Sequence, residues 1–275
     1  MKKKKIITRL SNELGNQLFM YASTFSIARK LNRELFIDTE SSFKSKKNIS
    51  NYGLFNFSIT SQIADDSDKF IGLKGYLKRK FLKKIDFFLK FKNFYLENKD
   101  KNKITKYDHN FNFTKLSDTA FFEGYFETEK YFLDIKSKII EEFSFIDIEK
   151  YKKNSFFNEI NKKNTVSICL RQNRFVEGKG KYNQQNMEKS NNFRNEQINY
   201  INKSINYIKE KIDNPTFYLW SNDLSNIDMS MFDSQIVKIH HNPEVILDVD
   251  KRSLDLFLIS QCNHHIVIPS SFNWW

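Results

Sequence analysis

Short apolar runs, bounded by polar loops, recur along the chain and predict the strands of parallel sheets. The clearest run is residues 166–170, Val-Ser-Ile-Cys-Leu, which stops abruptly at Arg171. An apolar run without alternation is typical of a strand that is buried on both faces. Two similar runs, residues 6–10 and 35–38, enclose residues 16–32, where apolar side chains recur at helical spacing. Strand, glycine-containing turn, helix and strand predict a βαβ unit at the start of the chain.

The second half of the chain alternates in the same way and predicts a Rossmann-like parallel sheet. Residues 175–192 are polar and predict a loop, and residues 195–212 predict an amphipathic helix that ends before Pro215. The remaining predicted elements are strands at residues 217–220, 236–239 and 265–268 and a helix at residues 253–262.

The middle of the chain is less regular. A strand is predicted over residues 121–126 and a helix over residues 129–143. Residues 145–164 are charged and rich in asparagine, without a clear period, and predict the crossing between two domains. We therefore expect an N-terminal α/β domain over residues 1–155 and a C-terminal Rossmann-like domain over residues 156–275.

Residues 76–95 combine aromatic side chains and leucines with many lysines, after the polar and irregular residues 41–75. Two interpretations are open. The segment is a basic amphipathic helix on an anionic membrane surface, or it is a helix that packs on its own domain and exposes a lysine face. Read as a helix, most lysines lie opposite an apolar arc formed by Leu77, Phe81, Leu82, Ile85, Phe88 and Leu89.

Composition narrows the choice of partner and compartment. The net charge of +12 over 275 residues favours anionic partners such as nucleotides, nucleic acid or a membrane surface. The two cysteines, Cys169 and Cys262, lie in apolar segments and indicate reduced, buried thiols. No signal peptide or segment of transmembrane length is visible. We expect a cytoplasmic protein, with peripheral contact on the inner face of the cytoplasmic membrane under the first interpretation above.

Polar residues gather where the predicted strands of the second half end. Arg171 follows one strand, Ser221 and Asp223 follow another, and the last strand leads into a third cluster. The carboxyl ends of strands in a doubly wound sheet converge on one crevice, where such sheets bind ligands. Arginine can clamp a diphosphate, while serine hydroxyls can donate to phosphate oxygens and an aspartate can accept from a base or ribose. The third cluster is Ser270, Ser271 and Phe272, whose ring can stack on a base.

Each of these residues also has a purely structural interpretation. Serine and aspartate are common helix caps, and an arginine at a strand end can form a surface ion pair. The sequence contains no Asp-x-Asp, no phosphate-binding P-loop motif and no spacing of metal ligands, so no metal is implied. No motif of a catalytic serine nucleophile is present. The aromatic residues follow core-like periods and no recognition motif occurs, which argues against a nucleic-acid-binding protein.

Several motifs, in order along nearly the whole chain, resemble one enzyme family. Residues 12–22, Asn-Glu-Leu-Gly-Asn-Gln-Leu-Phe-Met-Tyr-Ala, resemble the Gly-Gly-Leu-Gly-Asn-Gln-Leu-Phe-Gln-Tyr-Ala opening of the bacterial α-1,2-fucosyltransferases, glycosyltransferase family 11. Residues 124–132 resemble its Gly-Tyr-Phe-Gln-Ser-Glu-Lys-Tyr-Phe, and residues 220–223 its Phe-Ser-Asp-Asp. Residues 255–264 and 270–275 resemble its Asp-Leu-x-Leu-Met-Ser-x-Cys-x-His and Ser-Ser-Phe-Ser-Trp-Trp.

The resemblance implies a GT-B fold, with two Rossmann-like domains facing across a cleft. It also implies an inverting, metal-independent transfer of fucose from GDP-fucose to a galactose hydroxyl. The acceptor would be an oligosaccharide or lipid-linked glycan, as in lipopolysaccharide biosynthesis, and the donor would bind the second domain. By motif position, Arg171 matches the essential arginine of His-x-Arg-Arg-x-Asp, and Ser270, Ser271 and Phe272 match the donor-binding Ser-Ser-Phe. Asn16, in the opening loop, would contact the sugar or the acceptor.

The chain departs from the family pattern around its essential arginine. The family histidine falls on Cys169, the second arginine on Gln172, and a Gly-Asp pair on Asn173 and Arg174. One cation is lost and another stands in place of a carboxylate. The chain also ends at Trp275, where family members continue into a terminal helix, so a missing helix is expected. These departures keep a second hypothesis open, a non-catalytic or altered-donor paralogue with a nucleotide-sugar pocket.

Overall fold

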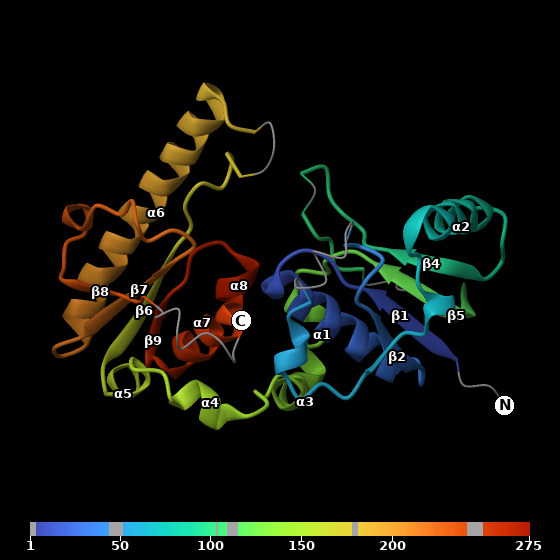
Figure 1. Ribbon diagram of the computed structural model, residues 1–275, viewed down its shortest axis with the longest axis horizontal. Coiled ribbons are helices and arrows are strands. Elements are labelled where there is room, and N and C mark those ends of the chain that lie inside the picture. The colour runs from blue at the N-terminus through green and yellow to red at the C-terminus, as the bar shows by residue number, and fades with distance from the viewer. Residues whose placement is uncertain (1–3, 44–51, 103, 109–114, 178–180, 241–249) are drawn as a thin grey trace. The chain divides into compact units, whose positions relative to one another are not determined.

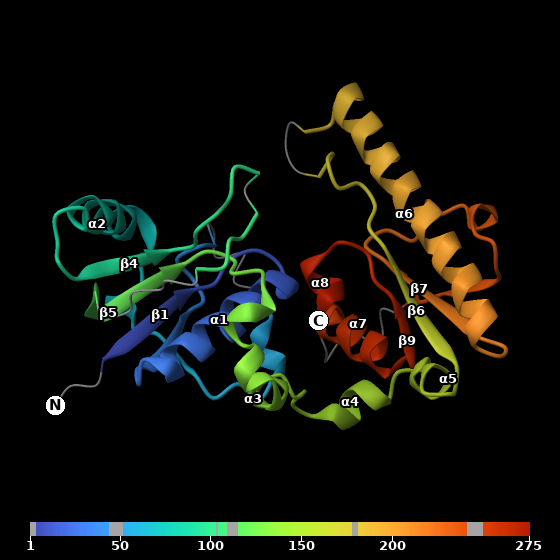
Figure 2. The ribbon, with the colours of Figure 1, turned by 180° about the vertical axis from the view of Figure 1, so that it is seen from behind.

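The computed structural model describes residues 4–43, 52–102, 104–108, 115–177, 181–240 and 250–275. The chain forms two compact units, residues 1–146 with Trp275 and residues 147–274. Each unit contains one parallel sheet with helices on both faces, as Figures 1 and 2 show from opposite sides.

The sheet of the first unit has the strand order β3-β2-β1-β5-β4, and all of its strands are parallel. Its longest helix is α1, Leu14–Lys30, whose residues are nearly all buried. A cluster that includes Ile7, Phe70 and Phe121 forms the core on the side of helix α2, Gly72–Ile85. The predicted opening βαβ unit is confirmed. The strands are β1 Lys5–Arg9, β2 Glu34–Asp38, β3 Gln62–Ile63, β4 Lys92–Leu96 and β5 Leu116–Glu123.

Two expectations for the first unit are wrong. The predicted helix over residues 76–95 ends at Ile85 and is followed by strand β4. The Asp86 carboxylate accepts hydrogen bonds from the backbone N–H groups of Asn93 (2.9 Å) and Phe94 (2.8 Å). These bonds fix the turn between helix α2 and strand β4. The predicted helix over residues 129–143 is broken into two 3₁₀ turns and the short helix α3, Lys136–Glu142.

The sheet of the second unit has the order β8-β7-β6-β9, again with all strands parallel. Helix α6, Gln184–Lys211, covers one face and helix α7, Lys251–Gln261, the other (Figure 1). The apolar run before Arg171 is confirmed as a buried strand of this sheet. Residues of β6, β7 and α6 share one buried cluster. The strands are β6 Thr165–Leu170, β7 Thr216–Ser221, β8 Ile236–Lys238 and β9 His264–Ile266.

The second unit begins at Asp147, earlier than the predicted boundary between residues 155 and 156. The short helices α4, Ile148–Lys152, and α5, Phe157–Ile160, belong to it because both pack on α7. The rings of Tyr151 and Phe157 lie 5.2 and 5.8 Å from that of Phe257, a residue of α7, measured between centroids.

Helix α6 is longer than expected. We predicted a loop over residues 175–192, but the helix begins at Gln184. The Asn183 side chain caps it by accepting a hydrogen bond from the backbone N–H of Asn186 at 2.9 Å. Gly178 and Gly180 of the predicted loop lie outside the described residues.

Candidate active site

The second sheet changes winding direction beside its central strand. From β6 the chain adds β7 and β8 on one side, and then crosses by α7 to place β9 on the other side of β6. Open α/β sheets bind ligands at such a switch point, outside the carboxyl ends of the strands. Arg171 follows β6 directly, and Ser270 lies in the segment that follows β9. Two of the three predicted clusters therefore flank the switch point.

The Arg171 backbone is fixed by hydrogen bonds, while its side chain is partly exposed and forms an ion pair. The buried amide of Gln197, on α6, accepts from the Arg171 N–H at 2.9 Å and donates to the Arg171 carbonyl at 2.9 Å. The Arg171 side chain is 42% exposed, and its Nη2 lies 2.8 and 2.6 Å from the two carboxylate oxygens of Glu177. The Glu177 carboxylate thus pairs with the guanidinium in this structure, and the role of Arg171 in donor binding stays a prediction.

The ends of β6 and β7 are joined by side-chain amides. The Gln172 N–H donates to Asn222 Oδ1 at 2.8 Å, and Asn222 Nδ2 donates to the Gln172 carbonyl at 3.2 Å. The Gln172 side chain is buried and donates to the Asp223 carbonyl. Gln172 therefore acts as a structural tie, at the position where the family has its second arginine.

Ser221 and Asp223 build the turn after β7 out of their own hydrogen bonds. The Ser221 hydroxyl donates to the Asp223 carbonyl at 3.0 Å. Asp223 Oδ1 accepts from the Ser225 hydroxyl at 2.6 Å and from its N–H at 3.1 Å. These hydrogen bonds lower the pKa of Asp223, and the bond from the Ser225 hydroxyl has the largest effect. The structure thus brings both residues next to Gln172 in a turn, where they cap no helix. Their binding role stays a prediction.

The third cluster lies beside a pocket of about 530 Å³. The Ser270 hydroxyl accepts from the Phe272 N–H at 3.2 Å at the start of the short helix α8, Ser271–Trp274. Ser271 and Phe272 are half-buried, and neither lines the pocket. The pocket lies between α6 and the segment after β9, where its lining includes Phe193, Gln197, Tyr200, Ile268, Ser270 and Trp274.

A second cation stands near this pocket. Asn173 has a positive φ of 59°, and Arg174 follows it in the turn. The Arg174 guanidinium carbon lies 5.1 Å from the centroid of the Phe193 ring, and this ring lines the pocket. Among the described residues Arg174 has no carboxylate within ion-pair distance. Its charge is therefore available to an anion bound at the pocket.

Cys169, at the family's histidine position, is a buried thiol in β6. Burial raises its pKa far above the ordinary value, with a smaller contribution from Asp255. The thiol is neutral at physiological pH, so this position offers neither a cation nor a base.

The first unit has a switch point of its own, between β1 and β5. Asn12 Nδ2, after β1, donates to the Tyr125 hydroxyl, after β5, at 2.6 Å. Asn16 Nδ2, in the first turn of α1, donates to Glu127 Oε1 at 2.5 Å. Asn16 therefore lies in an exposed polar cluster at the edge of the sheet where a sugar could bind. Its catalytic role stays a prediction.

A buried carboxylate orders the segment after β5. Glu97 Oε1 accepts from the Phe126 N–H at 2.7 Å, and Oε2 accepts from the Tyr125 N–H at 3.0 Å. Gly124 precedes them with a φ of 154°, and a Cβ atom there would lie 2.1 Å from the Cβ of Glu97. Glycine is required at this position by the close approach of Glu97.

We expect Gly124→Ala to lower the free energy of unfolding of the first unit by about 2–4 kcal/mol, because the new methyl group overlaps an atom fixed to the backbone. Gly72→Ala is the matched control, since Gly72 also has a positive φ but no atom lies within 4 Å of the position that a Cβ would take there. The control should lose only about 1 kcal/mol of backbone strain. Urea denaturation of both variants gives the comparison, and equal losses would show that Glu97 moves aside.

Two residues that organise the candidate site were not singled out from the sequence. Gln197 precedes the buried Ile198 on the apolar face of α6, and a polar side chain on such a face needs a partner. That signal indicates a buried hydrogen bond, and the structure shows that the partner is the Arg171 backbone. Glu97 gave no comparable local signal, because its partners follow β5 in the sequence. Among the described residues, no group of three or more histidine, cysteine, aspartate or glutamate side chains could hold a metal ion.

Comparison with known proteins gives the context for this geometry. The sequence pattern of Glycosyl transferase family 11 matches residues 1–275. The chain belongs to glycosyltransferase family 11. It is similar to the alpha-1,2-colitosyltransferase of Escherichia coli, with 26% identity over 98% of this chain and 86% of that protein. The predicted family membership is confirmed, and the chain is a fucosyltransferase-like glycosyltransferase.

Solved structures support the fold. The fucosyltransferase NodZ from Bradyrhizobium matches 100% of this chain and 92% of its own, with a TM-score of 0.58 and 15% identity. POFUT1 in complex with GDP matches 99% of this chain and 93% of its own, with a TM-score of 0.51 and 12% identity. The family 11 chain thus has the predicted GT-B-like fold, built from two Rossmann-like units.

Proposed function

We propose that this family 11 protein transfers fucose from GDP-fucose to a galactose hydroxyl, with inversion, to form an α-1,2 linkage. The acceptor is an oligosaccharide or lipid-linked glycan, as in the synthesis of lipopolysaccharide or another surface glycan. Family membership supports the reaction class, and the relative's name supports the α-1,2 linkage. The observation that carries the proposal is the half-exposed Arg171 fork at the switch point of the second sheet.

In the proposed reaction, the acceptor hydroxyl gives its proton to solvent water and its oxygen forms a bond to the anomeric carbon, while the bond from that carbon to the β-phosphate oxygen breaks. The electron pair leaves with GDP. Arg171 exchanges Glu177 for the diphosphate and neutralises the charge that grows on the leaving oxygen. This role needs no metal ion, so the proposed donor site is metal-independent. Asn16 and the polar residues around it are proposed to bind the acceptor.

Two measurements test this function. Calorimetric titration with GDP should give the same affinity in magnesium and in EDTA. Incubation with GDP-fucose and a galactoside should then release GDP, and NMR of the product should show an α-linkage at the galactose 2-position. A requirement for magnesium would refute the metal-free mechanism, and failure to bind any nucleoside diphosphate would refute the function.

A second candidate is an altered-donor or non-catalytic family member. The buried, neutral Gln172 favours it, because the family's second arginine is replaced by a residue whose amide is used within the fold. The colitosyltransferase relative shows that the family includes other donor sugars. Binding of GDP without GDP release from GDP-fucose separates this candidate from the first. A thermal-shift screen of other GDP-sugars would then identify an altered donor.

Arg174 is expected to replace part of the charge missing at Gln172. We expect Arg174→Gln to weaken GDP binding roughly tenfold to a hundredfold, because a charged hydrogen bond to phosphate contributes about 1.5–3 kcal/mol. Binding of GMP, which lacks the β-phosphate, should change less. Lys203→Gln, which removes an exposed cation from α6, is the matched control. Equal GDP affinities of the wild type and Arg174→Gln would exclude this role.

A further inference from the structure

Helix α2 turns Arg79 and Lys83 toward the sheet and most of its large apolar side chains outward. The residues that face the sheet are spaced at helical intervals: Gly75, Arg79, Leu82, Lys83 and, just after the helix, Asp86. No residue within α2 is buried. Helix α2 packs on its own unit through Leu82, which joins the packed core. Most of the predicted apolar arc stays exposed instead of facing that core.

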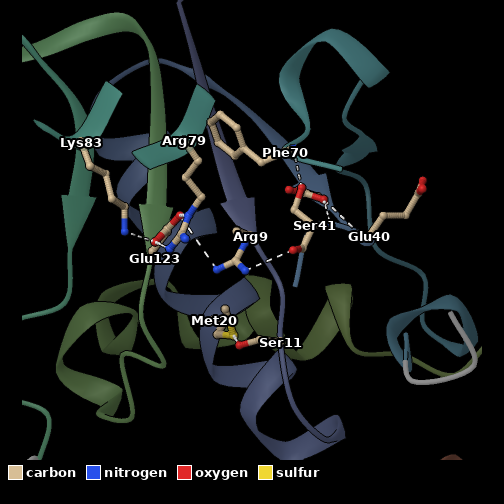
Figure 3. A network of polar contacts seen from close by, with 10 residues as sticks. Arg9, Ser11, Met20, Glu40, Ser41, Phe70, Arg79, Lys83 and Glu123 are labelled. Atoms are coloured by element: carbon tan, nitrogen blue, oxygen red, sulfur yellow. Dashed lines mark hydrogen bonds and ion pairs between the residues drawn. The ribbon is translucent and has the colours of Figure 1, made fainter. Parts of the chain in front are cut away.

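Salt bridges hold the helix in this orientation. Arg79 and Lys83 both bond to the Glu123 carboxylate at the end of β5, as Figure 3 shows. Gly75 permits the close approach at the other end, since a Cβ there would lie 2.3 Å from the Phe70 carbonyl carbon. The side chains on the opposite face are therefore fixed away from the sheet.

The outward side chains form a large apolar surface. Leu73 is 75% exposed, Phe81 62%, Phe87 83% and Phe88 80%. We call this the α2 surface, and define it by Leu73, Tyr76, Leu77, Phe81, Phe87 and Phe88. Soluble proteins rarely leave so many neighbouring large apolar side chains exposed unless something binds there.

Within residues 71–92 the exposed charged side chains are all positive. Lys74, Lys80, Lys84 and Lys90 are exposed, and among the described residues none of them forms an ion pair. The single carboxylate in residues 71–92 is Asp86, which is buried and bonded to the backbone of the following turn. An apolar surface interspersed with lysines that form no ion pair among the described residues complements an anionic, partly apolar partner.

We propose that the α2 surface binds the face of an anionic lipid bilayer. The phenylalanine and leucine side chains enter the boundary between headgroups and acyl chains, and the lysines reach the anionic headgroups. Exposed lysines add attraction to such a surface, which decreases as salt is added. No helix of the described residues is long and apolar enough to cross a membrane. This inference does not depend on the identity of the sugar donor.

The test is flotation of the whole protein with vesicles. The wild type should float with vesicles of phosphatidylcholine mixed with phosphatidylglycerol, and should stay behind with phosphatidylcholine alone. Lys80→Gln with Lys84→Gln should lower partitioning on the order of thirtyfold. Phe87→Ser with Phe88→Ser should abolish flotation, because the variant lacks two of the side chains that enter the bilayer. Both pairs are exposed, so GDP affinity and thermal midpoint should remain those of the wild type.

Lys162→Gln with Lys163→Gln is the matched control, because it removes the same charge from exposed positions in the second unit. Equal loss in this control would show non-specific attraction and would overturn the proposal. Failure of the wild type to float would overturn it as well. A dimer on a sizing column that Phe87→Ser with Phe88→Ser converts to monomer would assign the α2 surface to a second copy of the chain instead.

Discussion

Arg171→Lys should lower kcat/KM for sugar transfer by roughly a hundredfold to a thousandfold, or about 3–4 kcal/mol of transition-state stabilisation. Lysine keeps the charge but lacks the planar pair of donors that matches two phosphate oxygens. The exposed Arg171 side chain contributes little to packing, so the thermal midpoint should stay unchanged. GDP release from the sugar nucleotide measures the rate.

Glu177→Gln is the control for this variant. It removes the partner of the Arg171 guanidinium but leaves the fork in place. The variant should bind GDP at least as tightly as the wild type, because the diphosphate no longer competes with a carboxylate. Transfer by Arg171→Lys at a rate near that of the wild type would refute the proposed role of Arg171.

Glu123→Ala should destabilise the first unit by roughly 3 kcal/mol. The carboxylate bonds to Arg79 and Lys83, and Arg9 Nη1 lies 3.9 Å from it (Figure 3). Its removal leaves three partly buried cations close together without their shared counter-charge. Urea denaturation gives the change, and Asp118→Ala, at a carboxylate that is 82% exposed, should cost less than about 1 kcal/mol.

The same carboxylate predicts a pH dependence. Burial alone would raise the pKa of Glu123, but the hydrogen bonds and charges of Arg79 and Lys83 outweigh it and hold the pKa below 4.5. A carboxyl whose pKa is lower in the folded than in the unfolded state stabilises the protein at pH values above the unfolded-state pKa. This contribution is lost as the pH falls through the folded-state pKa. Glu123→Gln should therefore lose less stability than the wild type between neutral pH and pH values below about 4.5. Parallel losses would contradict this assignment.

The sequence predicted best where one local pattern determined the outcome. An apolar run that ends at a charge located β6 and Arg171, because a strand buried on both faces needs no tertiary information to be recognised. The order of the motifs placed Ser270 in the neighbouring segment. The start of α6 was missed because residues 184–194 are almost entirely polar. This part of the helix begins at the Asn183 cap and has no apolar stripe.

The orientation of α2 could not be read from its own residues. Helical periodicity located an apolar arc, and such an arc ordinarily faces the core. Here the direction is set by Glu123, which is 44 residues from Arg79 and 40 from Lys83. In the same way, the loss of the family's second arginine looked like the loss of a charge, and only the structure shows that Gln172 joins the ends of two strands.

Burial of both cysteines has a practical consequence for labelling. Cys169 and Cys262 are the only cysteines in the sequence, and burial raises the pKa of Cys262 to about 12 as well as that of Cys169. Alkylating reagents attack the exposed thiolate, so the unmodified protein should react slowly with maleimides. A cysteine introduced at position 80 would then be the one residue labelled by a fluorophore. The emission of this fluorophore would report directly on the polarity around helix α2.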